Sequence, residues 1–378
     1  MQFRDLKKQY QVLKEKIDPA ITEVTTNCNF IMGSQVEELE EMLANYVGVK
    51  HCITCGNGTD ALNLAMLVWK IGVNDAVFVP DFTFFSSGEI VSLVGATPIF
   101  VDVDEDTFNI NPELLEQQIL KVKEEGSLVP KAIVAVDLFG LPADYKAIKA
   151  IADKYGLFLL EDGAQGFGGE INNKRACSFG DISTTSFFPA KPVGCYGDGG
   201  AVFTDNDEWA DLLKSYRVHG KGNNKYDNIR IGLNSRLDTV QAAILKIKLE
   251  AFSDYELDDI NEIASLYNNM LSSFIKIPQI PKTHLSSWAQ YTIQLKDKET
   301  RDGLQLYLKN QEIPSMVYYQ KPMHEQKAFL DSRINNIDNG DYKITKKLCD
   351  SVLSLPMHPY LNKSDIQLVT KAIKTYLK

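Results

Sequence analysis

The sequence has few cysteines, no excess of positive charge and no long apolar run, and each shortage excludes a class of protein. Six cysteines among 378 residues are too sparse for a disulfide-stabilised fold. The net charge of −10 argues against nucleic acid or an anionic membrane as the main partner. No uninterrupted apolar stretch reaches the roughly 20 residues that span a bilayer. Because the first residues are also polar and lack the apolar core of a signal peptide, we expect a cytoplasmic protein.

Signatures of metal and dinucleotide binding are missing as well. Cys52 and Cys55 form a single CxxC without a second pair, and the five histidines are scattered, so we expect buried thiols and no metal site. The run Gly56-Asn57-Gly58-Thr59-Asp60-Ala61 lacks the lysine of a P-loop and the third glycine of the dinucleotide fingerprint. A nicotinamide-dependent dehydrogenase is therefore disfavoured.

Apolar runs and amphipathic stretches alternate through the first half of the chain, which predicts an α/β domain with a mostly parallel sheet. A further helix is expected to begin at Ser34 with a capping box. The length favours two domains, which we place at residues 1–250 and 251–378. The expected strands cover residues 51–55, 76–80, 98–103, 131–137 and 157–161, and the expected helices cover residues 59–70, 86–94, 112–124, 144–155 and 237–252.

One lysine stands in an unusual setting. Lys191 lies between Pro189 and Pro192, and the cluster Gly197-Asp198-Gly199-Gly200 follows it. Prolines fix φ and glycines widen the accessible backbone conformations, so the amine is held at a defined point of an irregular loop. A desolvated lysine loses proton affinity and becomes nucleophilic. This setting suits a lysine that forms a Schiff base.

Two further groups are expected at the carboxyl ends of strands, where α/β proteins bind ligands. The first group is the glycine-containing turn that leads into a helix at Gly58 and Thr59. It suits a phosphate, because free amides and the helix dipole attract anions. Asp162 ends an apolar strand, and such a carboxylate could bind a metal, a ribose or a protonated ring nitrogen. Pyridoxal phosphate needs three such groups: a helix start for its phosphate, a lysine for its aldehyde and a carboxylate for its ring nitrogen. Its flat ring also suits an aromatic partner, and Thr83-Phe84-Phe85 follows the strand that ends at Pro80.

With these residues in view, the chain resembles the nucleotide-sugar aminotransferases of the DegT family, which are fold type I PLP-dependent transferases. The resemblance runs nearly end to end. Its most specific stretches are 186–200 and Gly232-Leu233-Asn234-Ser235-Arg236-Leu237-Asp238, followed by Gln241-Ala242-Ala243. It implies an α/β fold with a large PLP-binding domain around a mostly parallel central sheet and a smaller C-terminal α/β domain.

The resemblance also implies roles for particular residues. Lys191 would attach the cofactor covalently and shuttle the proton, and Asp162 would pair with the ring nitrogen. Asn234 would reach the cofactor phosphate of a neighbouring subunit, so that a homodimer shares its active sites. The remaining cofactor contacts would be Gly58, Thr59 and Ser186 to the phosphate, Gln165 to the ring hydroxyl and Phe84 on the ring, and the substrate contacts would be Arg236, Tyr318 and Tyr319.

The implied reaction is amino transfer from glutamate to a keto nucleotide-sugar, for surface polysaccharide such as O-antigen. The chain looks closest to members that aminate the C3 ketone of a UDP-2-acetamido hexose or its uronic acid. Relatives that handle uronates often show His-Tyr-Pro where this chain has Tyr318-Tyr319-Gln320. The C6 group is therefore open, and C4 or dTDP-linked ketosugars are alternatives.

The fold is also compatible with two other functions, and the role of one basic stretch is open. Sugar dehydratases of the same fold replace the lysine by histidine, which Lys191 contradicts. A non-catalytic regulator could keep the fold, although all the cofactor positions are intact. The basic stretch is either a solvated loop or a diphosphate site near the dimer seam, and it comprises Arg217, Lys221, Lys225 and Arg230.

Overall fold

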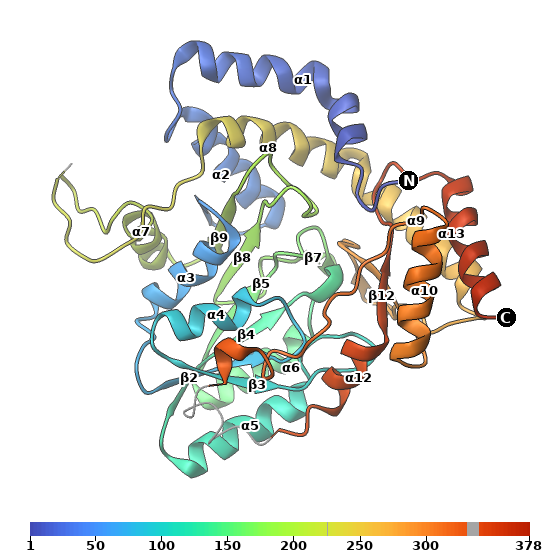
Figure 1. Cartoon of the computed structure of the whole chain (residues 1–378). Helices are drawn as coiled ribbons and strands as arrows, with labels where there is room; N and C mark the ends of the chain where they lie inside the picture. Colours follow the sequence, from blue (N-terminus) through green and yellow to red (C-terminus); the bar gives the residue numbers. More distant parts are fainter. Residues whose placement is uncertain (225, 331–339) are drawn as a thin grey trace.

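A seven-stranded sheet forms the centre of the molecule in the computed structural model, which describes residues 1–224, 226–330 and 340–378. The strands lie in the order β1-β9-β8-β5-β4-β2-β3 (Figure 1). Their bounds are β1 His51–Cys55, β2 Asp75–Pro80, β3 Thr97–Val101, β4 Val129–Val136, β5 Phe158–Asp162, β8 Ile182–Ser186 and β9 Gly200–Thr204.

The direction of the strands confirms the expected mostly parallel sheet. Strands β3, β2, β4, β5 and β8 are parallel, whereas β9 runs antiparallel to both β8 and β1. The carboxyl ends of β1, β2, β4, β5 and β8 consequently meet at one edge of the sheet. Strand β9 begins at that same edge, where Gly200 is paired with Ser186 and with Cys55.

Helices cover both faces of the sheet because its buried side chains point alternately to either side. Side chains such as Ile53, Val202 and Leu160 pack with α3 (Gly58–Val68), α4 (Ser86–Leu93) and α7 (Asp207–Tyr216). The other face packs against further helices, which are α2 (Ser34–Val47), α5 (Pro112–Glu125), α6 (Tyr145–Tyr155) and α8 (Thr239–Ala251). On each face, buried aliphatic and aromatic side chains fill the space between the sheet and its helices.

The N-terminal helix α1 (Leu6–Asn27) lies along α8, outside the sandwich (Figure 1). Leu13 and Ile17 of α1 are buried against Ile244 of α8. The amino terminus then reaches the C-terminal part of the chain, where the Met357 amide donates to the Phe3 carbonyl at 3.2 Å. The amino-terminal segment thus contacts both α8 and the C-terminal part of the chain.

The C-terminal part has a hydrophobic core of its own, drawn from residues between Ile260 and Ile373. It surrounds an antiparallel pair, β11 (Tyr291–Gln294) and β12 (Val352–Leu355). The surrounding elements are the five-residue π-helical turn η2 (Phe252–Glu256), α9 (Leu257–Leu271), α10 (Lys298–Asn310), α12 (Lys343–Ser351) and α13 (Lys363–Tyr376). The small remaining elements are η1 (Leu138–Gly140), η3 (Lys327–Phe329) and a sheet of β10 (His284–Leu285), β6 (Glu170–Ile171) and β7 (Lys174–Arg175).

The predicted strands and helices of the first half are confirmed, with ends that shift by one or two residues. The capping box at Ser34 was wrong, because Gly33 occupies the N-cap and no side chain caps the helix. Helix α1 and strands β8 and β9 were not predicted. Strand β8, Ile-Ser-Thr-Thr-Ser, carries hydroxyls instead of an apolar run, which hides it from a hydrophobicity pattern.

Candidate active site

The residues predicted to bind a cofactor gather at the carboxyl edge of the sheet. Gly58 opens α3 after β1, Asp162 ends β5 and Ser186 ends β8. Lys191 lies in the loop between β8 and β9. Strand order explains the grouping. Strands β8 and β5 are neighbours, and only β9 lies between β8 and β1.

Asp162 is a buried carboxylate, 5% exposed, that receives two hydrogen bonds. Ser87 Oγ donates to its Oδ2 at 2.8 Å and the Ala164 amide donates to its Oδ1 at 3.2 Å. Burial raises the pKa of Asp162, while these two donors and the charge of Lys191 lower it. A cation placed against this carboxylate would therefore be strongly stabilised.

Lys191 is partly buried, and burial lowers the pKa of its ammonium. The negative charge of Asp162 opposes this shift, and the positive charge of Arg4 adds to it. The Lys191 amide donates to the Phe188 carbonyl at 2.8 Å, which closes a tight turn between the two prolines. The loop therefore presents an amine that loses its proton more readily than a surface lysine.

Gly58, Thr59 and Ser186 form a cradle at the N-terminus of α3. A Cβ on Gly58 would lie 2.7 Å from the Ser186 Cβ, so only glycine permits this approach. Thr59 Oγ1 and Ser86 Oγ are 2.8 Å apart. Within the described residues, the Gly58 and Thr59 amides donate to no acceptor. Free amides and hydroxyls at a helix start suit a phosphate.

Gln165 and Tyr319 meet beside Asp162. Gln165 Nε2 donates to the Tyr319 hydroxyl at 3.1 Å, and its Oε1 accepts from the Phe139 amide at 2.8 Å. Phe84 is 54% exposed, and its ring centroid lies 6.4 Å from that of Tyr319. The predicted aromatic residue thus stands at the mouth of the site with a face available for stacking.

Asn234 and Arg236 are not joined to the Lys191 and Asp162 group by any hydrogen bond or ion pair of the described residues. Asn234 is exposed, whereas the intervening Ser235 is buried. Ser235 Oγ accepts from the Gly56 amide at 2.9 Å and donates to Asp60 Oδ2 at 2.6 Å. The segment is therefore anchored beside the cradle through Ser235, while Asn234 is exposed and Arg236 is partly exposed.

Sequence reasoning missed several polar residues that are buried around the site. Ser87 was one of them, although a hydroxyl pair after Thr83-Phe84-Phe85 could have drawn attention. Asp81 follows β2 and is fully buried, and it accepts from the His324 amide at 2.8 Å. Asp137 and Glu161 are also fully buried, and burial raises the pKa of each carboxyl. These contacts join distant segments, so no local pattern reveals them.

The basic stretch does not act as one unit. Arg217 is buried and pairs with Glu40, and it also donates to the Thr54 carbonyl at 2.8 Å, so its role is structural. Arg230 Nη1 donates to Ser215 Oγ at 2.6 Å. Lys221 and Arg230 line a hollow of about 800 Å³. Lys225 lies outside the described residues.

No group of three or more metal-ligating side chains is found in residues 1–224, 226–330 and 340–378. Cys52 and Cys55 are buried free thiols, and burial raises the pKa of Cys55 to about 12. No helix of the described residues is long and apolar enough to cross a bilayer.

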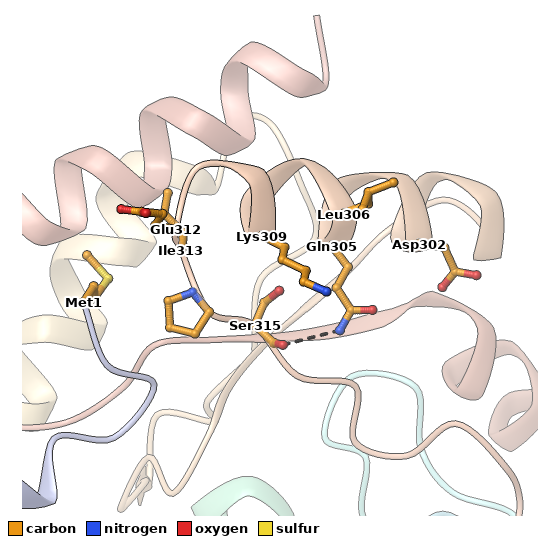
Figure 2. Close-up of a pocket in the computed structure, with 9 residues that line it drawn as sticks. Met1, Asp302, Gln305, Leu306, Lys309, Glu312, Ile313 and Ser315 are labelled. Atoms are coloured by element: carbon orange, nitrogen blue, oxygen red, sulfur yellow. Dashed lines mark hydrogen bonds between the residues drawn. The ribbon is translucent and has the colours of Figure 1, made fainter.

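A hollow of about 600 Å³ lies away from this site, on the C-terminal part (Figure 2). Figure 2 shows Gln305 reaching from α10 to the Ser315 carbonyl, to which its Nε2 donates at 3.3 Å. Met1, Asp302, Lys309 and Glu312 line the same hollow with mixed charge. None of the predicted site residues takes part in it.

Pyridoxal phosphate requires a lysine of lowered proton affinity, a buried carboxylate and a site for its phosphate. The site has all three, and among the described residues no cation contacts the Asp162 carboxylate directly. Fold and site therefore define a PLP-dependent aminotransferase, and the residues present fit that cofactor. Residues 11–374 match the DegT/DnrJ/EryC1/StrS aminotransferase family, to which the chain belongs. Homologues and structural neighbours of the chain are sugar aminotransferases, and the chain is an enzyme of this class.

Individual relatives agree with this assignment over their whole length. The UDP-2-acetamido-2-deoxy-3-oxo-D-glucuronate aminotransferase of Pseudomonas aeruginosa is 42% identical over 99% of both chains. The UDP-N-acetyl-3-dehydro-alpha-D-glucosamine 3-aminotransferase of Acidithiobacillus ferrooxidans is 36% identical over 99% of this chain and 97% of its own. A family aminotransferase from Brucella abortus superposes with a TM-score of 0.96 and 46% identity, covering 100% of this chain and 99% of that one.

Proposed function

We propose that the protein transfers an amino group from glutamate to the C3 ketone of a UDP-2-acetamido hexose. The similarity to two enzymes whose names specify 3-oxo UDP-sugars supports the substrate class. The observation that carries the proposal is that a partly buried Lys191 and a buried Asp162 lie within electrostatic reach of each other at the carboxyl edge of the sheet. Amination of a C4 ketone or a dTDP-linked sugar is the alternative.

Pyridoxal phosphate, when bound, supplies the carbonyl that reacts with amines and the ring that accepts carbanion electrons. Asp162 would hold the ring nitrogen protonated, since its buried carboxylate favours an adjacent cation. Lys191 would attach the cofactor through Nζ and, once released, move the proton as general base and then acid. Burial lowers the pKa of Lys191, which makes the amine easier to deprotonate.

The other site residues position the cofactor and the sugar in this proposal. Gly58, Thr59 and Ser186 would hold the phosphate, and Phe84 would cover the ring. Gln165 would bind the ring hydroxyl while its amide stays fixed by Phe139 and Tyr319. Tyr318, Tyr319 and Arg236 would contact the substrate.

We also propose a homodimer in which Asn234 reaches the partner's cofactor phosphate. Large apolar side chains support an interface near this segment, because Ile231 is 92% exposed and Phe30 47% exposed. Ile31 forms a backbone bridge with Asp238, which brings the two regions together. Residues 251–378 would form the smaller domain of each subunit. The enzyme would act in the cytoplasm, and its amino sugar would be used for surface polysaccharide such as O-antigen.

The substrate assignment is tested with ketosugars generated in situ. UDP- and dTDP-linked 3-keto and 4-keto sugars, with and without a C6 carboxylate, are incubated with glutamate, and amine and 2-oxoglutarate are quantified. We expect amination of a UDP-linked 3-keto sugar, which stops in Lys191→Ala. Amination of only 4-keto or dTDP-linked sugars would refute the proposed substrate.

The shared site is tested by mixing two inactive variants, Lys191→Ala and Asn234→Ala, under conditions that exchange subunits. A mixed dimer then carries one intact site, so activity should return to about a quarter of the wild-type value. Activity that stays absent despite confirmed exchange would show that Asn234 and Lys191 serve the same site within one chain.

A further inference from the structure

The amino-terminal segment places an arginine against the loop that carries Lys191. Arg4 Nη2 donates to the Lys191 carbonyl at 2.7 Å and to the Pro192 carbonyl at 3.3 Å. Within the described residues, Arg4 forms no ion pair with a carboxylate. Burial lowers the pKa of this partly buried guanidinium to about 10, while Glu256 and Tyr360 attract its charge.

Neighbouring contacts hold Arg4 in this place. The Phe3 carbonyl accepts from the Met357 amide, and the Phe3 ring packs edge-on against Tyr318 at 6.3 Å. Glu256 is buried and attracts the Arg4 charge, and Gln9 Nε2 donates to this carboxylate at 2.9 Å. Phe3 thus contacts the C-terminal part, and Glu256 at the end of η2 interacts with both Arg4 and Gln9 of α1. These contacts hold the segment that carries Arg4.

The loop itself leaves few backbone groups to fix it. Two prolines remove amide donors on either side of Lys191, and its own amide is used in the turn to Phe188. The Tyr196 amide, further along the loop, donates to Gln241 Oε1 of α8 at 2.8 Å, and the carbonyls of Lys191 and Pro192 give a second attachment next to the amine. A guanidinium suits that task because its planar fork can bind two acceptors.

The charge of Arg4 has a second effect. The charged groups that act on the Lys191 amine are Asp162, which favours the ammonium, and Arg4, which disfavours it. Around Arg4 itself, the titratable groups are Glu256, Tyr360, Lys248 and His358. The charge of Arg4 therefore opposes that of Asp162 and adds to the effect of burial, which is the larger cause of the lowered pKa of Lys191.

We propose that Arg4 is a positioning residue for Lys191, which fixes the lysine loop through two carbonyls and brings a positive charge near the amine. The proposal rests on the role proposed for Lys191. It assigns the first residues of the chain to the active site, although none of them touches the cofactor cradle.

The test measures the lysine in cofactor-free protein, without an activity assay. Competitive labelling with acetic anhydride between pH 7 and 11, followed by mass spectrometry of the Lys191 peptide, gives the pH midpoint of amine reactivity. In Arg4→Gln, which keeps a donor and loses the charge, the midpoint should rise by about half a pH unit or more. Arg4→Lys keeps the charge and should leave the midpoint near wild type.

Loop fixation has its own readout in hydrogen exchange. Amides of residues 188–195 should exchange faster in both Arg4 variants, because lysine and glutamine cannot reproduce the fork. Arg175→Met is the matched control, since Arg175 also donates to a backbone carbonyl, that of Tyr46, far from Lys191. It should change neither readout.

An Arg4→Gln midpoint equal to those of wild type and Arg175→Met would overturn the electrostatic part, and unchanged exchange in Arg4→Lys would overturn the positioning part. If Arg4→Gln fails to fold, Arg4→Met replaces it in the labelling experiment. Arg4→Lys still decides whether Arg4 slows hydrogen exchange in the loop. Borohydride reduction of the holoenzyme, which traps the cofactor on its lysine, separately tests the role of Lys191. Failure of that role is thus distinguishable from failure of this inference.

Discussion

The imidazole of His324 and the carboxylate of Asp81 join two parts of the chain that are far apart in sequence, with His324 Nδ1 2.7 Å from Asp81 Oδ2. The His324 amide also donates to Asp81 Oδ1, and the ring stacks on Tyr342 at 4.2 Å. Asp81 follows β2, at the edge of the sheet that carries the site. The pair therefore fixes the segment that begins with Tyr318 and Tyr319 over that edge.

We expect His324→Ala to loosen the tyrosine segment and weaken sugar binding more than cofactor binding. The KM for the ketosugar should rise about tenfold, equivalent to roughly 1.4 kcal/mol, with a smaller change in cofactor affinity. Steady-state kinetics and a cofactor titration measure the two effects. His284→Ala, on β10, serves as the control, and an equal effect of both variants would contradict the positioning role.

Asp162→Asn should fold normally and lose most of its turnover. Asparagine can still accept from Ser87, but it carries no charge to favour a protonated ring nitrogen. We expect kcat to fall by about 10²–10³-fold or more, a loss of roughly 3–4 kcal/mol of transition-state stabilisation. Thermal denaturation should show little change. Near-normal kcat in this variant would remove Asp162 from the proposed mechanism.

Gly58→Ala should damage the phosphate cradle, because the new methyl would lie 2.7 Å from the Ser186 Cβ. Relieving this overlap costs about 1–3 kcal/mol, so cofactor affinity should fall by about tenfold or more. Titration of the apoprotein with pyridoxal phosphate measures it. In Gly72→Ala the nearest contact would be an ordinary 3.7 Å, and its affinity should match wild type.

Lys248 is 1% exposed, and burial lowers its pKa to about 8. The unfolded chain, with a lysine pKa near 10.4, binds more protons between these values, so folding stability should rise from about pH 8 to 10. Lys248→Met should stabilise the protein at pH 7 by about 1–3 kcal/mol, with a gain that shrinks above pH 8. Denaturant unfolding at several pH values measures this. Lys246→Met, two residues earlier and paired with Glu38, should gain nothing.

His358 is 4% exposed, and burial lowers its pKa to about 4. The unfolded chain takes up this proton near pH 6.5, so the stability held above pH 6.5 is lost as the pH falls towards 4. At pH 5 the loss from this one group is about 2 kcal/mol. His358→Asn should flatten the pH dependence of unfolding free energy in this window. The exposed His219→Asn should leave the slope unchanged.

Much of the central sheet and the main site residues could be predicted because their signals are local. Apolar runs mark β1 to β5, and the prolines and glycines around Lys191 mark an irregular loop. Strand β8 was missed since its hydroxyl residues are buried by tertiary packing, which composition does not reveal. Ser87 and Arg4 were missed because their partners, Asp162 and the Lys191 carbonyl, lie far away in sequence.

The reversed direction of β9 determines how the lysine loop is built. A parallel neighbour after β8 would require the chain to cross to the far edge of the sheet before returning. Because β9 is antiparallel, the chain turns back at the ligand-binding edge as a wide hairpin, with both stems locked into the sheet by the Ser186 and Gly200 pairing. Changes of loop length between these stems would shift the amine directly, so we expect this hairpin to tolerate insertions poorly compared with the other loops at that edge.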